Sequence, residues 1–300
     1  MSVYKKDLKK IFDKNLIFNE LLSKYSWFNI GGPAEIFFRP SNFDQLTTFL
    51  KKIRNLNLHI NTIGAGSNTL IRDGGIKGIT IKLSSKFSFC NLIDEEKIEV
   101  GAATLDKNIS NFALENSVTG MEFLSCIPGT IGGSIIMNSG CYDHDISKIL
   151  LSIKTLNHKG EIKVIDRNNI EFYYRSTNIP NDLIITSAIL KGKKDKKINI
   201  EKKQLSFIKK KKLSQPSQVK TCGSTFKNPP NKKAWDLIDQ SHCGGLRVGN
   251  AKISEKHSNF FVNKGDAKFN DMKKLIDFVT ESVFKKTGIS IEKEIKILEN

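Results

Sequence analysis

One glycine-rich stretch constrains this chain more than any other: Ile127-Pro-Gly-Thr-Ile-Gly-Gly-Ser-Ile-Ile-Met-Asn-Ser-Gly140. Three glycines and a proline occupy its first seven positions, so the backbone can turn tightly and approach a flat or charged ligand closely. Glycine-rich turns also connect strands that touch no ligand. The stretch is therefore a candidate ligand-binding loop that needs support from the rest of the chain.

The length and apolar content are typical of a folded chain without a membrane span. With 300 residues and 39% hydrophobic residues, the chain is expected to form two or three compact units. It contains no run of about 18 apolar residues, which a helix crossing a bilayer needs. Its N-terminal segment alternates charged and apolar residues and lacks the continuous apolar core of a secretory signal. We therefore expect a cytoplasmic protein with no membrane partner.

The cysteines are odd in number and form no Cys-x-x-Cys pair. This arrangement argues against both a zinc site and a disulfide framework. We expect reduced thiols and no metal site. The five cysteines are Cys90, Cys126, Cys141, Cys222 and Cys243.

The formal net charge of +17 has two explanations. A basic protein can bind nucleic acid or an anionic substrate, or it can simply have a lysine-rich surface. The excess is nearly all lysine, whereas proteins that read phosphates and base edges also use arginine. The densest block, from Lys191 to Lys212, fits the solvated face of a helix with Ile200, Leu205 and Ile208 inward. We therefore favour a lysine-rich surface and expect no nucleic-acid partner.

Apolar spacing predicts helices along the whole chain. Residues 1–20 are expected to form a short amphipathic helix with Leu8, Ile11, Phe12 and Leu16 on one side. Further helices are expected to begin at Ser41, at Thr104, near residue 200, after Asn231 and near residue 270.

The helix at Ser41 begins with a pattern that resembles a capping box, because Asp44 follows three residues later. Strands are expected between the helices, and a final strand over 289–297 would place Glu292 and Glu294 on one face by alternation. The other expected strands cover about 60–63, 69–72, 78–83, 97–102, 150–156, 161–166 and 183–191.

A second glycine motif, Gly64-Ala-Gly-Ser-Asn68, follows an expected strand. A dinucleotide-binding fingerprint would place a third glycine and a helix after it, and both are missing here. Consecutive backbone N–H groups in such a turn can still bind an anion without a helix. The motif therefore supports a phosphate-binding turn only in combination with other motifs.

Six motifs together resemble the UDP-N-acetylenolpyruvoylglucosamine reductase family. They occur in the family's order from about residue 20 to the end of the chain, which makes the match specific although each motif alone is weak. The motifs are Asn29-Ile-Gly-Gly-Pro-Ala34, Gly64-Ala-Gly-Ser-Asn68, Ile127-Pro-Gly-Thr-Ile-Gly-Gly133 with Asn138-Ser-Gly140, Tyr174-Arg175, Gly223-Ser-Thr-Phe-Lys-Asn-Pro229 and Glu292-Lys-Glu-Ile295.

The resemblance implies an α+β flavoenzyme with an FAD-binding fold of the vanillyl-alcohol-oxidase type and a C-terminal substrate domain. NADPH would reduce a non-covalently bound FAD, which would reduce UDP-N-acetylglucosamine enolpyruvate to UDP-N-acetylmuramate for peptidoglycan synthesis. Such an enzyme serves cell wall biogenesis, cell shape, the cell cycle and cell division, and we expect a monomer. The expected divisions are an N-terminal helix over 1–20, FAD-binding lobes over 21–83 and 84–192, and a substrate-binding domain over 193–300.

The resemblance also implies which residues carry the function. The catalytic positions are Arg175, Ser224 and Glu294. The FAD-binding positions are Gly64, Ala65, Gly66, Ser67, Asn68, Pro128, Gly129, Thr130, Gly132, Gly133 and Gly140. The positions that line the substrate pocket are Tyr142, Tyr174, Lys212 and Asn228.

The chemistry explains why the catalytic positions need these residue types. Hydride addition to C3 of the enolpyruvyl group sends negative charge into the adjacent carboxylate, and the fixed cation of Arg175 can bind that carboxylate bidentately. Ser224 matches the family's proton donor to C2. An ionised Glu294 would repel the substrate carboxylate, so we expect Glu294 to be protonated when substrate is bound.

Some features point to a particular branch, and two alternatives remain. The short interval between Arg175 and Ser224 indicates the branch without an extra substrate-covering loop. The glycine stretches contain no histidine, so covalent flavin attachment has no obvious residue. The alternatives are an FAD oxidase of the same fold, which would consume oxygen, and a lysine-rich nucleic-acid-binding protein, which would need more aromatic residues in its basic block than Phe207 alone.

Overall fold

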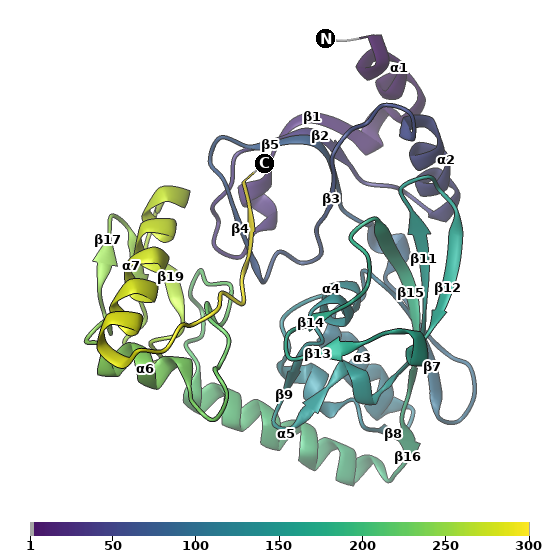
Figure 1. Cartoon of the computed structure of the whole chain (residues 1–300). Helices are drawn as coiled ribbons and strands as arrows, with labels where there is room; N and C mark the ends of the chain where they lie inside the picture. The colour runs from purple at the N-terminus through teal and green to yellow at the C-terminus, as the bar shows by residue number, and fades with distance from the viewer. Residues whose placement is uncertain (1–2, 300) are drawn as a thin grey trace. The chain divides into compact units, whose positions relative to one another are not determined.

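The structure is a computed structural model that describes residues 3–299. The chain forms two compact units, each assembled from segments that are far apart in the sequence. Figure 1 shows the path of the chain by colour. The first unit holds the residues up to Phe18, Ile36–Ala65 and Gly78–Lys210, and the second holds Asn19–Glu35, Gly66–Lys77 and the residues from Lys211 on.

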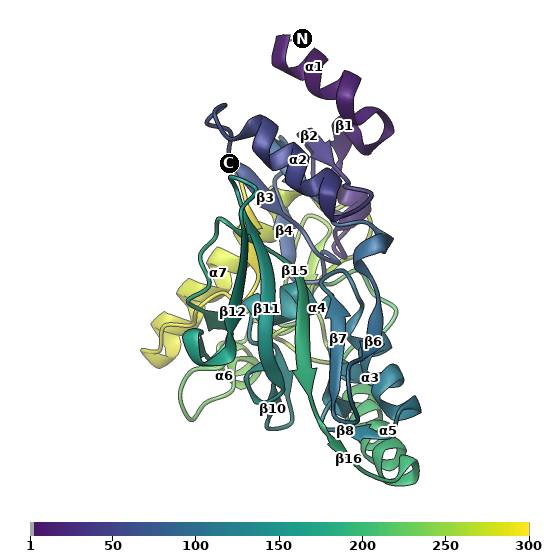
Figure 2. The ribbon, with the colours of Figure 1, turned by 90° about the vertical axis from the view of Figure 1, so that its right-hand side faces the viewer.

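The first unit contains an antiparallel sheet with strand order β12-β11-β15-β7-β6. Ile153 of β11 pairs with Ala188 of β15, which pairs on its other side with Val100 of β7. In Figure 2 these strands follow one another across the view. Their bounds are β6 Cys90–Leu92, β7 Lys97–Gly101, β11 Leu150–Asn157, β12 Ile162–Asp166 and β15 Leu183–Lys191.

Two helices cover the apolar side chains of this sheet, and together they form the larger core of the first unit. They are α3 (Asp106–Glu115) and α4 (Ile131–Ile136), and α4 packs against β7 and β15. Ile98, Ile109 and Ile135 are fully buried in this core. The α4 helix begins directly after Thr130, so the glycine-rich stretch forms the entry to a helix that lies on the sheet.

A second core of the first unit lies under α1 (Val3–Phe12) and α2 (Phe43–Ile53). The α2 stripe is buried as its spacing predicted, but Ser41 is not the cap. Asn42 accepts a 2.8 Å bond from the main-chain N–H of Gln45, so the helix starts one residue later than expected. The strands beside these helices are β1 Leu16–Leu21, β2 Pro33–Phe38, β3 Ile60–Thr62 and β5 Ile76–Ile81, in the order β1-β2-β5-β3.

The N-terminal helix is shorter than the expected 1–20, of which residues 1–2 lie outside the described part. It ends at Phe12, because Asp13 has a left-handed backbone (φ +38°) and Lys9 donates to the carbonyl oxygens of Asp13 and Leu16. Leu16 therefore opens β1 rather than extending the helix. Leu8 is buried as expected, whereas Ile11 is exposed.

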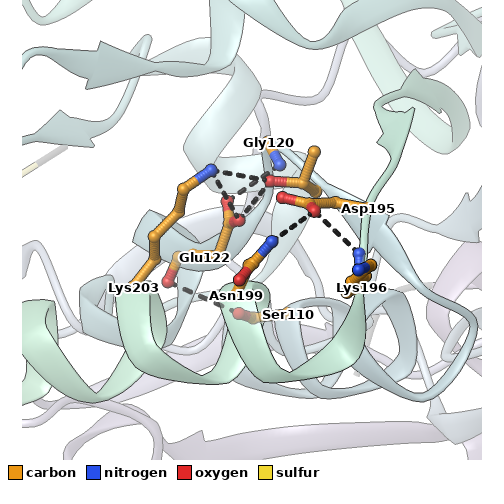
Figure 3. A network of polar contacts seen from close by, with 8 residues as sticks. Ser110, Gly120, Glu122, Asp195, Lys196, Asn199 and Lys203 are labelled. Carbon is orange, nitrogen blue, oxygen red and sulfur yellow. Dashed lines mark hydrogen bonds and ion pairs between the residues drawn. The ribbon is translucent and has the colours of Figure 1, made fainter.

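The lysine block forms a helix, α5 (Lys197–Ser214), whose inner face is more polar than its sequence suggested. Gln204 is buried and donates to Ser110 and Asn111, whereas Leu205, expected inward, is exposed. The polar side chains of α3 that face α5 accept hydrogen bonds from the Gln204 amide, and the spacing of apolar residues gives no sign of such an inward glutamine. Figure 3 shows a second anchor, in which Lys203 reaches the buried carboxylate of Glu122 at 3.8 Å.

The second unit is built around α6 (Ala234–Gln240) and α7 (Phe269–Thr287), whose apolar faces share one core. As the sequence predicted, α7 ends at Gly288, which adopts the left-handed conformation of a helix cap (φ +71°). Trp235, expected among the apolar residues of α6, is exposed. The strands of this unit are β17 Arg247–Val248, β18 Ala251–Ile253 and β19 Phe261–Asn263 in one sheet, with β4 Thr69–Ile71 and β20 Lys296–Leu298 as a parallel pair.

The expected final strand over 289–297 is mostly irregular. Only residues from Lys296 pair with β4, because the preceding segment bonds instead to the loop around Thr225. Across residues 3–299, no helix is both long and apolar enough to cross a membrane. The remaining short strands are β8 Val118–Thr119, β9 Gly140–Cys141, β10 His144–Asp145, β13 Phe172–Tyr173, β14 Ser176–Thr177 and β16 Lys193–Lys194.

Candidate active site

The first half of the glycine-rich stretch is fastened to residues 102–106 of the first unit. The main-chain N–H of Ile131 donates to Thr104 at 2.9 Å, and that of Gly132 donates to the carbonyl oxygen of Ala102 at 3.0 Å. The N–H of Asp106 donates in return to the carbonyl oxygen of Gly129 at 3.1 Å. These main-chain hydrogen bonds fix the conformation of the loop, although it is rich in glycine.

The two glycine motifs meet inside the first unit. A Cβ atom placed on Gly64 would lie 2.6 Å from Oγ1 of Thr130, so a larger residue there would force the Thr130 side chain to move. The carbonyl oxygen of Gly64 accepts a hydrogen bond from the Lys82 ammonium, which sequence reasoning did not identify. Burial, with a smaller contribution from the Arg39 charge, lowers the pKa of Lys82 to about 8. An anion beside this loop would therefore meet a poorly solvated cation.

The rest of the second motif belongs to the second unit. Gly66 has φ +69°, and a Cβ there would lie 1.7 Å from the carbonyl oxygen of Tyr25, so only glycine fits. Asn68 accepts a main-chain bond from Lys296 at 2.9 Å, and its side chain donates to the carbonyl oxygen of Glu294 at 3.1 Å. The motif thus contacts the segment that carries a predicted catalytic residue.

Ser224 and Glu294 lie on neighbouring segments of the second unit. The main-chain N–H of Glu294 donates at 2.8 Å to the carbonyl oxygen of Thr225, the residue after Ser224. The side chain of buried Asn259 accepts from the N–H of Phe226 at 2.9 Å and donates to its carbonyl oxygen at 2.7 Å. Sequence reasoning missed Asn259, although an asparagine beside the apolar run of β19 was a signal that could have found it.

Arg175 lies in the first unit, at the two-residue turn between β13 and β14. Its backbone is left-handed (φ +59°), and its Nη2 donates to the carbonyl oxygen of Gly140 at 2.8 Å. The guanidinium carbon lies 4.9 Å from the centre of the Tyr174 ring. Asn138 bonds to Tyr173 at 3.1 Å, so this turn is fastened to the end of the glycine stretch at two points.

The remaining predicted substrate residues are dispersed. Tyr142 in the first unit stacks on Phe207 of α5, with ring centres 5.3 Å apart. Lys212 is exposed on α5 in the second unit. Asn228 in the second unit uses its side-chain oxygen to accept the N–H of Ala234 at 2.9 Å, where α6 begins. Among residues 3–299, no group of three or more His, Cys, Asp or Glu side chains could hold a metal ion.

These residues fit a flavin dinucleotide. Two glycine motifs meet at Gly64 and Thr130, Gly64 has no side chain to cover its backbone, and the Lys82 ammonium beside it is a positive charge that suits a diphosphate. Family models match in the corresponding places. A model described as an FAD binding domain matches residues 34–166, and one described as the UDP-N-acetylenolpyruvoylglucosamine reductase C-terminal domain matches residues 215–298.

Similarity to curated proteins extends over nearly the whole chain. The UDP-N-acetylenolpyruvoylglucosamine reductase of Pelagibacter ubique is 49% identical over 281 residues, which cover 92% of each chain. The chain belongs to the UDP-N-acetylenolpyruvoylglucosamine reductase family. The reductase of Rickettsia felis is 43% identical over 92% of this chain. The crystal structure of the Thermus caldophilus reductase matches with a TM-score of 0.83 at 31% identity and covers 94% of this chain and 98% of that one.

Membership of this reductase family confirms the resemblance found in the sequence. It also confirms the predicted α+β fold with an FAD-binding domain, the FAD cofactor and the oxidoreductase class. These matches give no support to the nucleic-acid-binding alternative.

Proposed function

We propose that Arg175, Ser224 and Glu294 are the catalytic side chains of this protein, which as a member of the family reduces UDP-N-acetylglucosamine enolpyruvate to UDP-N-acetylmuramate. When bound, FAD supplies hydride that originates from NADPH. The observation that carries the assignment is the direct bond from Glu294 to Thr225, next to Ser224, in a member of this reductase family. That bond holds the segments of Ser224 and Glu294 side by side, which supports a role for both side chains at one substrate.

Arg175 would bind the carboxylate of the enolpyruvyl group. A guanidinium is planar and always charged, and it matches a carboxylate with two parallel hydrogen bonds. The bond to Gly140 and the contact with the Tyr174 ring orient the group. A cation oriented in advance stabilises the negative charge that develops during the reaction at little reorganisation cost.

Ser224 would deliver the proton to C2, and Glu294 would donate a hydrogen bond from its protonated form. Both side chains are half-buried, which lets them reach a ligand and still be shielded from bulk water. Burial and the nearby substrate carboxylate would both favour the neutral form of Glu294. Two carboxylates that share a site cannot both be ionised cheaply, so a proton on Glu294 resolves the repulsion.

The cofactor residues in this proposal are the two glycine motifs. Tyr142, Tyr174, Lys212 and Asn228 would contribute to substrate binding, and the lysine would offer a point charge to the diphosphate. The lobes 21–83 and 84–192 would hold the cofactor, and 193–300 would bind substrate. The cofactor set is Gly64, Ala65, Gly66, Ser67, Asn68, Pro128, Gly129, Thr130, Gly132, Gly133 and Gly140.

The proposed setting is the cytoplasm, with the protein as a monomer that serves the cell cycle and division through wall synthesis. The substrate is a small charged nucleotide sugar, and peptidoglycan precursors of this kind are assembled where nucleotides and NADPH are present. Light scattering of the purified protein tests the monomer, and cell fractionation tests the location.

An anaerobic spectroscopic titration tests the reaction. The purified protein should be yellow, lose its flavin absorbance on addition of NADPH, and recover it on addition of UDP-N-acetylglucosamine enolpyruvate. Recovery with air but not with that substrate would contradict the proposal and favour an oxidase. A protein that stays colourless after addition of FAD would contradict the flavoenzyme assignment itself.

A further inference from the structure

A buried carboxyl group holds the glycine-rich loop from behind. Asp106, the first residue of α3, is fully buried, and its Oδ2 accepts a 2.6 Å hydrogen bond from the hydroxyl of Ser134 in α4. Its main-chain N–H donates to Gly129. Asp106 therefore contacts both ends of the segment Gly129–Ser134, which we call the clamped loop. The proposed catalytic residues do not include it.

The surroundings of Asp106 offer little to balance a negative charge. Its Oδ1 has no hydrogen-bond partner among residues 3–299. Neither α4 nor residues 102–105 and 127–130 carry an ionisable side chain, and Lys107 on α3 itself is exposed. The short helix 122–126 that packs on α3 adds the buried thiol of Cys126 and the carboxylate of Glu122, which lies 3.8 Å from Lys203.

Burial therefore dominates the ionisation of Asp106. It raises the pKa of this carboxyl to about 7, and the hydrogen bond from Ser134 opposes the rise only in part. The neutral acid can be buried behind the loop at little cost in free energy. The ionised carboxylate is costly to bury there, because a single hydroxyl donor does not replace the water that it loses. Because Asp106 has no exposed surface, water can reach the carboxylate only if its surroundings open, and the clamped loop, which it holds by two hydrogen bonds, is one of the segments that would move.

We propose that Asp106 is a positioning residue whose protonation keeps the clamped loop in the shape that binds FAD, so that the cofactor is held tightly by the neutral acid and weakly by the carboxylate. The proposal rests on the proposed function, because it takes this loop as part of the cofactor site. Linkage requires the reverse effect as well: FAD binding at alkaline pH takes up a proton at Asp106.

Release of FAD from the holoenzyme tests the proposal. Flavin fluorescence after dilution gives the dissociation constant between about pH 6 and pH 8.5, and above its pKa each pH unit changes affinity by up to about tenfold. For the unaltered protein we expect FAD to be bound about tenfold more weakly at the alkaline end. Asp106→Asn, a neutral side chain of the same shape, should lose the part of this pH dependence that comes from Asp106 and keep only the part from Lys82, whose pKa of about 8 also lies in this range.

Two further variants separate positioning from simple loss of structure. Ser134→Ala removes the bond that favours the carboxylate, so the weakening of FAD binding should move to higher pH. Ser110→Ala removes a buried hydroxyl from another face of α3, where it bonds to Glu122 and Gln204, and should leave the profile unchanged.

Certain outcomes would overturn the proposal. If the unaltered protein and Asp106→Asn lose FAD with the same dependence on pH, Asp106 does not couple protonation to binding. If Asp106→Asn fails to fold, the direction of the shift in Ser134→Ala decides, and no shift or a shift to lower pH contradicts the proposal. A protein that binds no FAD at any pH would instead contradict the proposed function.

Discussion

Nη2 of Arg175 donates a 2.8 Å hydrogen bond to the carbonyl oxygen of Gly140, the last residue of the glycine-rich stretch. One contact thereby joins the proposed substrate cation to the end of the proposed cofactor loop within the first unit. A change at Arg175 should consequently affect the step that involves substrate and have less effect on the step that involves NADPH.

We therefore expect Arg175→Lys to slow substrate reduction by about a hundredfold or more, because a lysine cannot replace the paired donors of a guanidinium. Flavin reduction by NADPH should remain within a few-fold of normal. Stopped-flow measurement of the two half-reactions checks this separation. Equal slowing of both half-reactions would count against the assigned role.

Arg175 has a left-handed backbone conformation, which is unfavourable for a residue with a side chain. A left-handed conformation costs a side chain with a Cβ atom about 1 kcal/mol or more, and glycine avoids that cost. Arg175→Gly should therefore unfold at a higher urea concentration than Arg175→Ala, with a free energy of unfolding that is greater by about 1 kcal/mol. Both variants lack the guanidinium, so they form a matched pair, and an Ala variant as stable as the Gly variant would show that the turn is relaxed.

The two Glu294 variants test whether this side chain acts as a neutral donor. Glu294→Gln keeps a hydrogen-bond donor without charge and should retain far more activity than Glu294→Ala. Both retain the main-chain bond to Thr225, so the loop should keep its place. The comparison is made on kcat for substrate reduction, and similar losses in the two variants would refute a protonated Glu294.

Asn259 should matter for stability because it makes two hydrogen bonds to Phe226 in a buried place. Replacement by alanine leaves a buried N–H and a buried carbonyl without partners, which costs about 2 kcal/mol or more. Urea denaturation of Asn259→Ala should show this loss. Asn270→Ala, at an exposed position of α7 in the same unit, provides the comparison and should change stability by less than about 0.5 kcal/mol.

Asp106 also predicts how stability changes with pH. Its pKa is 3.8 ordinarily and about 7 in the folded chain, so the folded state holds the proton more tightly than the unfolded state. This contribution to stability is complete below about pH 4 and is lost as pH rises to about 7, at up to about 1.4 kcal/mol per unit. In Asp106→Asn the urea midpoint of unfolding should change less with pH over this range. A pH dependence that is as large in the variant as in the unaltered protein must come from another group.

Local chemistry explains what the sequence predicted well. The stripe of α7, its stop at Gly288 and the strands of the large sheet all follow from spacing and backbone freedom. These signals lie within a few consecutive residues, so a single sequence contains them.

Contacts between distant segments explain what the sequence missed. Gln204 points inward because Ser110 and Asn111 accept hydrogen bonds from its side-chain amide. Glu294 lies in an irregular segment because its main-chain N–H donates to the carbonyl oxygen of Thr225. Asp106 was not among the residues that the sequence singled out, because its burial depends on contacts with Gly129 and Ser134. In each case the deciding partner lies tens of residues or more away, where spacing gives no information.

The parallel pairing of β4 with β20 has a consequence for synthesis. Thr69 pairs with Lys296, so an early strand waits for almost the entire chain before its neighbour exists. Until then the nascent chain has an edge of β4 whose main-chain N–H and C=O groups are unpaired, and such an edge can pair with another chain and cause aggregation. Completion of the second unit therefore waits until the segment around Lys296 has been made, and translational pauses before that point would prolong the period in which the nascent chain needs a chaperone.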